Sequence, residues 1–130
     1  MAEGHLRHAK ALLDAGLYAG AYYMCGYAVE CALKACICKN TKRFDFHPPP
    51  DESRAAWSHD FGKLIKAAEL EREFKAARTA DLDLDVKWKS VENWSPNSRY
   101  ESRGQPEAQL ILDAVADPDH GVFICIKRLW

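Results

Sequence analysis

Arg54 and His59 stand five positions apart and form a pair suited to phosphate chemistry. A histidine can give or take a proton near neutral pH, and an arginine beside it can hold a displaced phosphate. His59 would then be the acid–base group and Arg54 its helper. The same residues also have a structural interpretation, because His59 and Asp60 can cap a helix that follows them. The cap is the favoured interpretation, and the catalytic one stays open.

A second candidate surface lies on one side of the helix expected over residues 17–39. Four side chains fall within about 60° of one another on a helical wheel, opposite the apolar face: Tyr23, Tyr27, Glu30 and Lys34. Glu30 and Lys34 have the i, i+4 spacing of a helical ion pair. Two tyrosines on a fully solvated face would contribute little to the stability of the fold. This face is therefore predicted to contact a partner subunit or to line a groove. A plain solvated face is the alternative.

Other residues that could bind a ligand are Arg99 and Tyr100, which follow a tryptophan and a turn. Arg99 offers a planar fork to phosphate or carboxylate. Trp94 and Tyr100 could stack on a base or belong to the core. His5 and His8 share a face of the first helix, but no carboxylate or cysteine stands near them at ligand spacing. They are therefore predicted to be surface residues, and neither a metal nor another cofactor is expected.

Composition limits the classes of protein that need to be considered. The chain has 130 residues and a mass of 14.7 kDa, which predicts one domain over residues 1–130. Its net charge of −1 predicts no binding of nucleic acid driven by bulk charge, and no DNA partner is expected, although a local groove could still bind phosphate. The longest uncharged stretch, residues 15–29, is too short to cross a membrane, and no secretory signal is visible. The five cysteines contain no C-x2-C pair, which predicts free buried thiols in a reducing cytoplasm.

The helices that must position these residues are predicted from apolar residues that recur three and four positions apart. That spacing, with turn residues between, favours helices over about 2–15, 17 or 18–39, 59 or 60 onward, 107–116 and 118–129. Residues 71–80 are expected to be helical or to continue the helix before them. In residues 82–94 the alternation of Leu82, Leu84 and Val86 could suggest a strand, but no second strand is available to pair with it, so a turn and a further piece of helix are favoured. The segment 44–58 contains three consecutive prolines and is predicted to be one long loop. Ser58 is expected to cap the third helix, and Asp117 with Pro118 to begin the last one. The sum is an all-α, up-and-down bundle of about five helices.

Three motifs in this order resemble the HEPN-domain family. The run AYYMCGYAVECALKA, residues 21–35, is similar to the second helix of that family, and it places Glu30 and Lys34 at the family's polar pair. The run His59-Asp60-Phe61-x-x-Leu64 resembles the family's H-D-L-x-x-L at the third helix. Arg99-Tyr100 matches an R-Y dipeptide before the last helices. The order and spacing agree over nearly the whole chain.

The resemblance implies an all-α homodimer in the cytoplasm of a bacterium or archaeon. It also implies a minimal nucleotidyltransferase as partner, in a toxin–antitoxin-type or related defence system. Many HEPN proteins are metal-independent endoribonucleases that use an R-x4–6-H motif in a later helix. After Arg99 the only histidine here is His120, outside that spacing, and Arg54–His59 is the one literal match.

Three hypotheses about function follow from the residues and the resemblance. The first is a dimeric module whose groove binds a nucleotide, an RNA or a partner protein. The groove would be formed by Tyr27, Glu30, Lys34, His59 and Arg99, with Tyr23, Asp60 and Tyr100 as further members. The second is an endoribonuclease toxin in which His59 acts with Arg54 or Arg99. The third is a purely structural module of a larger assembly.

Overall fold

The computed structural model describes residues 1–44 and 57–130, and every regular element in these ranges is a helix. The elements are α1 (Ala2–Asp14), α2 (Tyr18–Phe44), α4 (Phe61–Ala67), α5 (Glu71–Ala80), α6 (Leu82–Val91), the 3-10 helix η1 (Pro96–Tyr100), α7 (Gln105–Ala116) and α8 (Val122–Leu129). The all-α class is confirmed, although the described ranges already hold more helices than the five expected. The predicted long loop, and Arg54 with it, falls largely on residues 45–56, outside the described part of the chain.

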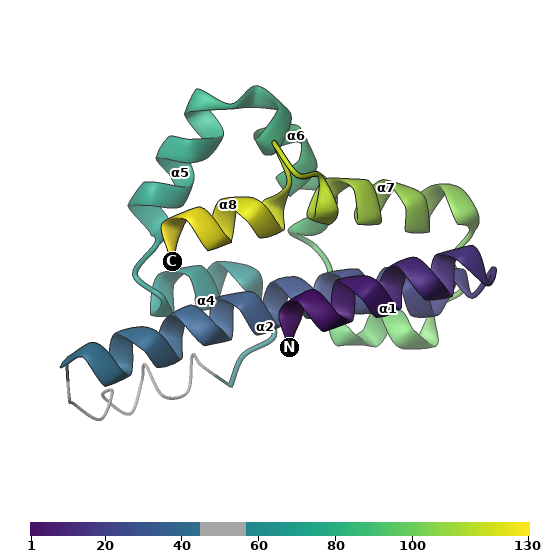
Figure 1. The fold of residues 1–130 in the computed structure, drawn as a ribbon, viewed down its shortest axis with the longest axis horizontal. Helices are drawn as coiled ribbons and strands as arrows, with labels where there is room; N and C mark the ends of the chain where they lie inside the picture. Colours follow the sequence, from purple (N-terminus) through teal and green to yellow (C-terminus); the bar gives the residue numbers. More distant parts are fainter. Residues whose placement is uncertain (45–56) are drawn as a thin grey trace.

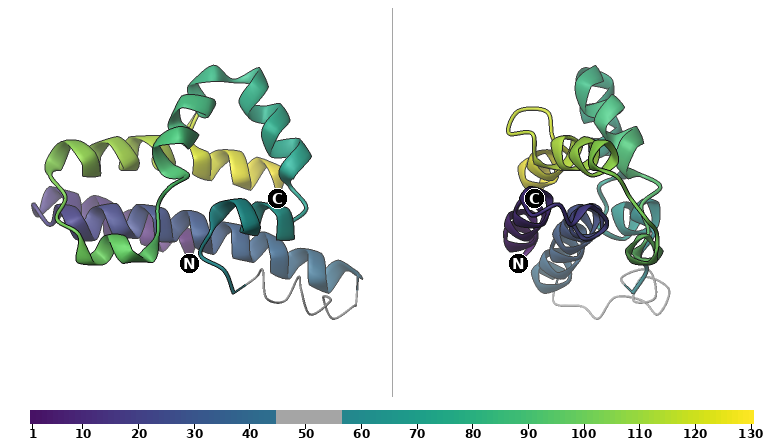
Figure 2. Two further views of the ribbon diagram at one scale, coloured as in Figure 1. Left: turned by 180° about the vertical axis from the view of Figure 1, so that it is seen from behind. Right: turned by 90° about the vertical axis from the view of Figure 1, so that its right-hand side faces the viewer.

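The long helix α2 is the centre of the fold. It contacts α1, α4, η1, α7 and α8. Its predicted apolar face is buried almost throughout: Ala21, Cys25, Ala28, Val29, Ala32, Leu33 and Cys36. α1 runs beside α2, and α7 and α8 follow one another along a different side of it (Figures 1 and 2). The apolar residues of α2, which recur three and four positions apart, thus form the surface on which the other helices assemble.

The helices α5 and α6 form a V that projects away from α2, and α8 passes beneath it (Figure 1). α8 contacts α2, α5, α6 and α7, so it joins this V to the rest of the bundle. The alternation of Leu82, Leu84 and Val86 suggested a strand, but residues 82–91 form a helix, as the favoured interpretation of that segment expected. Leu84 is buried, whereas Leu82 and Val86 are exposed.

Several predicted helix ends differ from the observed ones. α2 continues to Phe44, five residues beyond the predicted end. α4 begins at Phe61, and Asp60 is its N-cap because its carboxylate accepts a hydrogen bond from the backbone N–H of Lys63 at 3.0 Å. Ser58 was expected to cap this helix, but its hydroxyl accepts instead from the N–H of Asp60. The longer reach of the aspartate, two residues further on, fixes the helix start.

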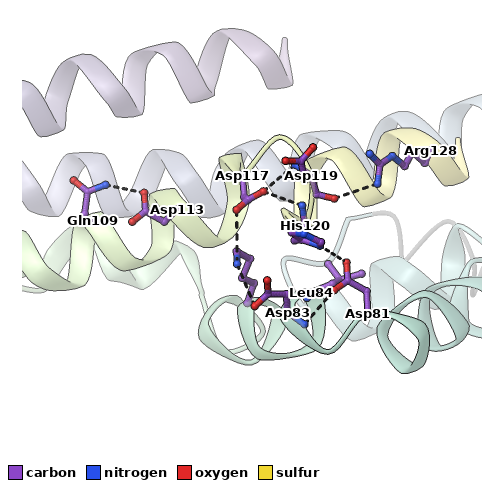
Figure 3. A network of polar contacts seen from close by, with 10 residues as sticks. Asp81, Asp83, Leu84, Gln109, Asp113, Asp117, Asp119, His120 and Arg128 are labelled. Carbon is purple, nitrogen blue, oxygen red and sulfur yellow. Dashed lines mark hydrogen bonds and ion pairs between the residues drawn. The ribbon is translucent and has the colours of Figure 1, made fainter.

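The prediction that a helix begins at Asp117 and Pro118 was wrong. α7 ends at Ala116, and the Asp117 carboxylate accepts hydrogen bonds from the N–H groups of Asp119 and His120, both at 2.8 Å. These bonds make a turn, and α8 starts only after Gly121 (Figure 3). A Cβ at Gly121 would lie 2.4 Å from the carbonyl oxygen of Asp117, so the turn requires glycine.

All five cysteines are free, as predicted, but they are not all buried. Cys25, Cys36 and Cys125 are buried, Cys31 is partly buried and Cys38 is exposed on α2. Burial raises the pKa of Cys25 to about 12, so this thiol stays protonated at neutral pH. The cysteines of the core therefore act as small apolar side chains.

Candidate functional site

The buried carboxylate of Glu30 is the centre of the candidate site. Glu30 is only 1% exposed, although it lies on the face of α2 opposite the main apolar face. Its Oε1 accepts a hydrogen bond from Lys34 Nζ at 2.7 Å and pairs with His59 Nδ1 at 2.8 Å. Burial of a carboxylate is costly unless donors replace its water, and these two groups do so. Its Oε2 has no hydrogen-bond partner among the described residues.

His59 reaches Glu30 because of the way α4 begins. The cap at Asp60 sets the direction of the chain, and the next residue, Phe61, is buried in the core at 1% exposure. Together they hold the backbone of His59 against α2. The imidazole itself is 57% exposed, and no described residue bonds its Nε2. A carboxylate at Nδ1 favours the tautomer that carries its proton there, which leaves Nε2 open toward solvent.

Lys34 completes the group from one turn further along α2. Its side chain is 33% exposed, and the favourable order of Glu30 and Lys34 on the helix supports their pairing. An ammonium and an imidazole therefore lie on the same carboxylate oxygen, and both reach the surface. The sequence predicted all three as parts of one groove, and the structure joins them through the Glu30 carboxylate.

The tyrosines predicted on the same face of α2 form a stack beside this group. The rings of Tyr23 and Tyr27 are 5.8 Å apart and nearly parallel, and His5 of α1 packs on Tyr27 at 4.7 Å. The Cys31 side chain, burial and the Glu30 carboxylate raise the pKa of Tyr27 above its ordinary value. Its phenol is therefore a neutral hydrogen-bonding group at physiological pH.

Trp94 covers α2 one turn before Glu30. A Cβ at Gly26 would lie 2.2 Å from atoms of the indole, so the ring packs directly on the helix backbone. The same indole stacks on Phe61 with ring centroids 5.4 Å apart and contacts Tyr23 at 5.8 Å. Trp94 is 4% exposed. Of the two interpretations offered by the sequence, stacking on a base or packing in the core, the structure supports the core.

Arg99 and Tyr100 lie on η1, which packs against α2. Both are exposed, and the guanidinium of Arg99 lies 4.7 Å from the centre of the Tyr100 ring. No hydrogen bond or ion pair joins either residue to Glu30, Lys34 or His59 within the described ranges. The dipeptide is thus exposed on a different element and is not bonded to the Glu30 group.

His5 and His8 were predicted to be surface residues, and His5 is only partly exposed. Neither ring nitrogen of His5 reaches solvent or finds a hydrogen-bond partner in the described ranges, and burial, with a smaller effect of His8, lowers its pKa. His8 is exposed. Where the structure describes the chain, it places no three His, Cys, Asp or Glu side chains so that they could hold a metal ion.

A second polar group, which the sequence did not indicate, joins α6 to the turn before α8 (Figure 3). His120 Nδ1 pairs with Asp81 Oδ2 at 2.7 Å, while Asp81 Oδ1 accepts from the N–H groups of Asp83 and Leu84 as the N-cap of α6. The hydrogen bond to Asp81 raises the pKa of His120, and the same bond lowers the pKa of Asp81. This contact joins the start of α6 to the turn that precedes α8.

The helical fold and the Glu30 group define a small all-α domain with a polar centre on its second helix. A family model of the HEPN domain matches residues 1–116, and the chain belongs to this family. No curated protein and no solved structure matches the chain significantly. α8 follows the matched segment. In the two described ranges, no helix has the length and hydropathy needed to cross a membrane.

Proposed function

We propose that this HEPN domain binds RNA at the surface formed by His59 and Lys34, and that it does so as a homodimer of single-domain chains. One observation carries the proposal: a buried carboxylate oxygen of Glu30 holds an imidazole and an ammonium side by side while both remain accessible to solvent. Such a pair offers hydrogen-bond donors and positive charge to a phosphodiester. Tyr23 and Tyr27, partly exposed beside it, supply aromatic surface.

A second function, metal-independent cleavage of the bound RNA, is supported by the orientation of His59. Because Glu30 engages Nδ1, Nε2 is free to take the proton from a ribose 2′-hydroxyl. The 2′-oxygen would bond to the adjacent phosphorus as the bond to the 5′-oxygen breaks, and that oxygen would leave with a proton from water. The products would be a 2′,3′-cyclic phosphate and a 5′-hydroxyl end. Lys34, with Arg54 or Arg99, would stabilise the charge on the phosphate.

The experiment is incubation of a mixed RNA pool with purified protein in excess chelator, with binding and cleavage measured in parallel. The parent is compared with His59→Ala and with His8→Ala, which removes an exposed histidine from α1. We expect binding by the parent and by His8→Ala and weaker binding by His59→Ala. Cleavage that survives chelator and is lost in His59→Ala would support the ribonuclease. Absence of RNA binding by the folded parent would contradict the proposal and favour a purely structural module.

The family membership also motivates a proposal about the cellular setting. We propose that the protein works in the prokaryotic cytoplasm in a toxin–antitoxin-type pair, with a minimal nucleotidyltransferase as its partner. The adjacent reading frame should then encode such an enzyme, and co-expression of the two proteins should give a complex that survives affinity purification. A neighbouring frame of another class, with no complex, would contradict this part alone.

A further inference from the structure

A groove between α4, α5 and α6 lies next to the His59 group and has no role in the function described so far. Its volume is about 770 Å³. Asp60, which directly follows His59, lines one part of it, and Arg72, Lys75 and Arg78 of α5 line another. The groove therefore begins one residue along the chain from His59.

The three cations on α5 are spaced to follow an extended ligand. They stand three residues apart, so successive side chains project from the same side of the helix with a rise of about 4.5 Å. Arg72 and Lys75 are exposed and form no ion pair with any described residue. Arg78 is held in place, because its guanidinium lies 5.3 Å from the centre of the Phe74 ring and 3.5 Å from Asp85.

The floor of the groove fixes the helix face that carries these cations. Phe74 and Trp88 line it and are buried, with their rings packed edge to face at 4.8 Å. Because Phe74 lies between Arg72 and Lys75 in the sequence, the face of α5 that carries the cations is fixed by packing of that ring. Two unpaired cations on a fixed face form a better anion site than the same side chains on a mobile loop.

Acidic residues also line the groove and restrict what fits. They are Asp60, Glu71 and Glu92. The carboxylate of Asp60 is engaged with the start of α4, whereas Glu71 and Glu92 are exposed. A duplex, with two closely spaced strands of phosphates, would bring more charge near these carboxylates than a single strand would. A single strand can run along the α5 side and leave Glu71 and Glu92 facing solvent.

We propose that a single strand of RNA bound at His59 continues along this groove, with its phosphates on Arg72 and Lys75. The inference rests on the proposed function, since it extends the same RNA. It adds the direction of the strand across the domain and the residues that give binding its salt dependence. Phosphate contacts of this kind position a strand without reading its sequence.

The test is binding of a fluorescein-labelled, mixed-sequence RNA single strand by the full chain, measured at several KCl concentrations. The variant carries Arg72→Gln and Lys75→Gln. The control carries Arg7→Gln and Lys10→Gln, which removes the same two residue types at the same spacing from the exposed surface of α1. We expect roughly tenfold weaker binding at low salt for the α5 variant, and a log–log salt slope that is shallower by about 1.4. The α1 control should match the parent.

Glu92→Gln provides an independent test, because it removes a negative charge from the groove and leaves the cations in place. It should tighten binding of the same strand, and a blunt RNA duplex should bind more weakly than the strand. An unchanged salt slope in the α5 variant, an equal effect in the α1 control, or tighter binding of the duplex would each overturn the groove as the path of the strand. If the folded parent binds no RNA at all, the proposed function itself fails.

Discussion

At the scale of single residues, the absence of a side chain at Gly26 lets Trp94 pack on the backbone of α2. The indole occupies the space that a side chain at residue 26 would need. We expect Gly26→Ala to lower the free energy of unfolding by about 1–3 kcal/mol, because overpacking outweighs the gain of about 1 kcal/mol in helix propensity. Urea unfolding followed by circular dichroism would measure the change.

Gly4→Ala is the matched control for this substitution. Gly4 also lies in a helix, but an added Cβ there would be 3.8 Å from the flexible end of Arg7. It should leave stability unchanged or raise it by up to about 1 kcal/mol. A Gly26→Ala protein as stable as Gly4→Ala would show that Trp94 does not pack on α2 as described.

The sequence was sufficient to predict which residues form the candidate site, but not the contacts that join them. Helical spacing alone places Glu30 and Lys34 on one side of α2, and both lie there. The burial of Glu30 and its bond to His59 depend on how α4 packs against α2, which is a long-range property that no local pattern contains. Trp94 is a similar case, since the glycine that admits it is 68 positions earlier in the chain.

At the scale of helices, aspartates set three boundaries in two different ways. Asp60 and Asp81 cap α4 and α6 through N–H groups of the first turn. Asp117 accepts from the two N–H groups of a turn that does not continue as a helix. The same short side chain serves both purposes, so Asp followed by Pro could not by itself show where α8 begins.

Asp60 was predicted as a groove residue, and its cap can be separated from any binding role by substitution. Asp60→Ala should destabilise the protein by about 1 kcal/mol, because the N–H of Lys63 loses its acceptor. Asp60→Asn keeps an acceptor of the same size and should retain most of the stability. Thermal unfolding of the two variants gives the comparison, and equal losses would argue against the cap.

The pair of His120 and Asp81 makes the link between α6 and the turn before α8 dependent on pH. The pKa of His120 is raised above 6.5, so its contribution to stability is complete below pH 6.5 and is lost as pH rises through the raised value. The pKa of Asp81 is lowered below 3.8, so its contribution is complete above pH 3.8 and is lost as pH falls through the lowered value. Both groups are charged between these limits.

His120→Gln should therefore reduce stability most between pH 3.8 and 6.5, and the difference from the parent should shrink in alkaline solution. Chemical denaturation at a series of pH values would trace this difference. His8→Gln, which alters an exposed histidine with no carboxylate bound to it in the described ranges, serves as control and should give a curve parallel to that of the parent. A constant loss at every pH in His120→Gln would contradict the ion pair.

At the scale of the whole molecule, the first question is the number of chains. The proposed homodimer should have twice the 14.7 kDa mass of the chain. Sedimentation equilibrium at micromolar concentration would measure it, and His59→Ala should leave the mass unchanged because this side chain is bonded within its own chain. A mass equal to one chain would contradict the dimer without affecting the Glu30 group.

The sequence was sufficient to predict the class of fold and the family, since helical periodicity and three ordered motifs extend over most of the chain. It was less informative about how the chain divides into helices. Residues 61–91 form three short helices with tight connections. Their apolar residues are spaced nearly as they would be in one longer helix. Glu69 has φ of 60° between α4 and α5, a conformation that nothing in its residue type required.

The position of α8 also has a consequence for synthesis of the protein. Lys39 donates to the backbone carbonyl of Trp130 at 2.5 Å, across 91 positions of the chain, and Phe123 and Ile126 lie beside Ala32 and Ala35 of α2. Because a ribosome makes the chain from its N-terminus, every helix that α8 contacts emerges before α8 does. This strip of α2 therefore remains uncovered on the nascent chain until α8 has emerged, and it is the surface that a ribosome-bound chaperone would meet.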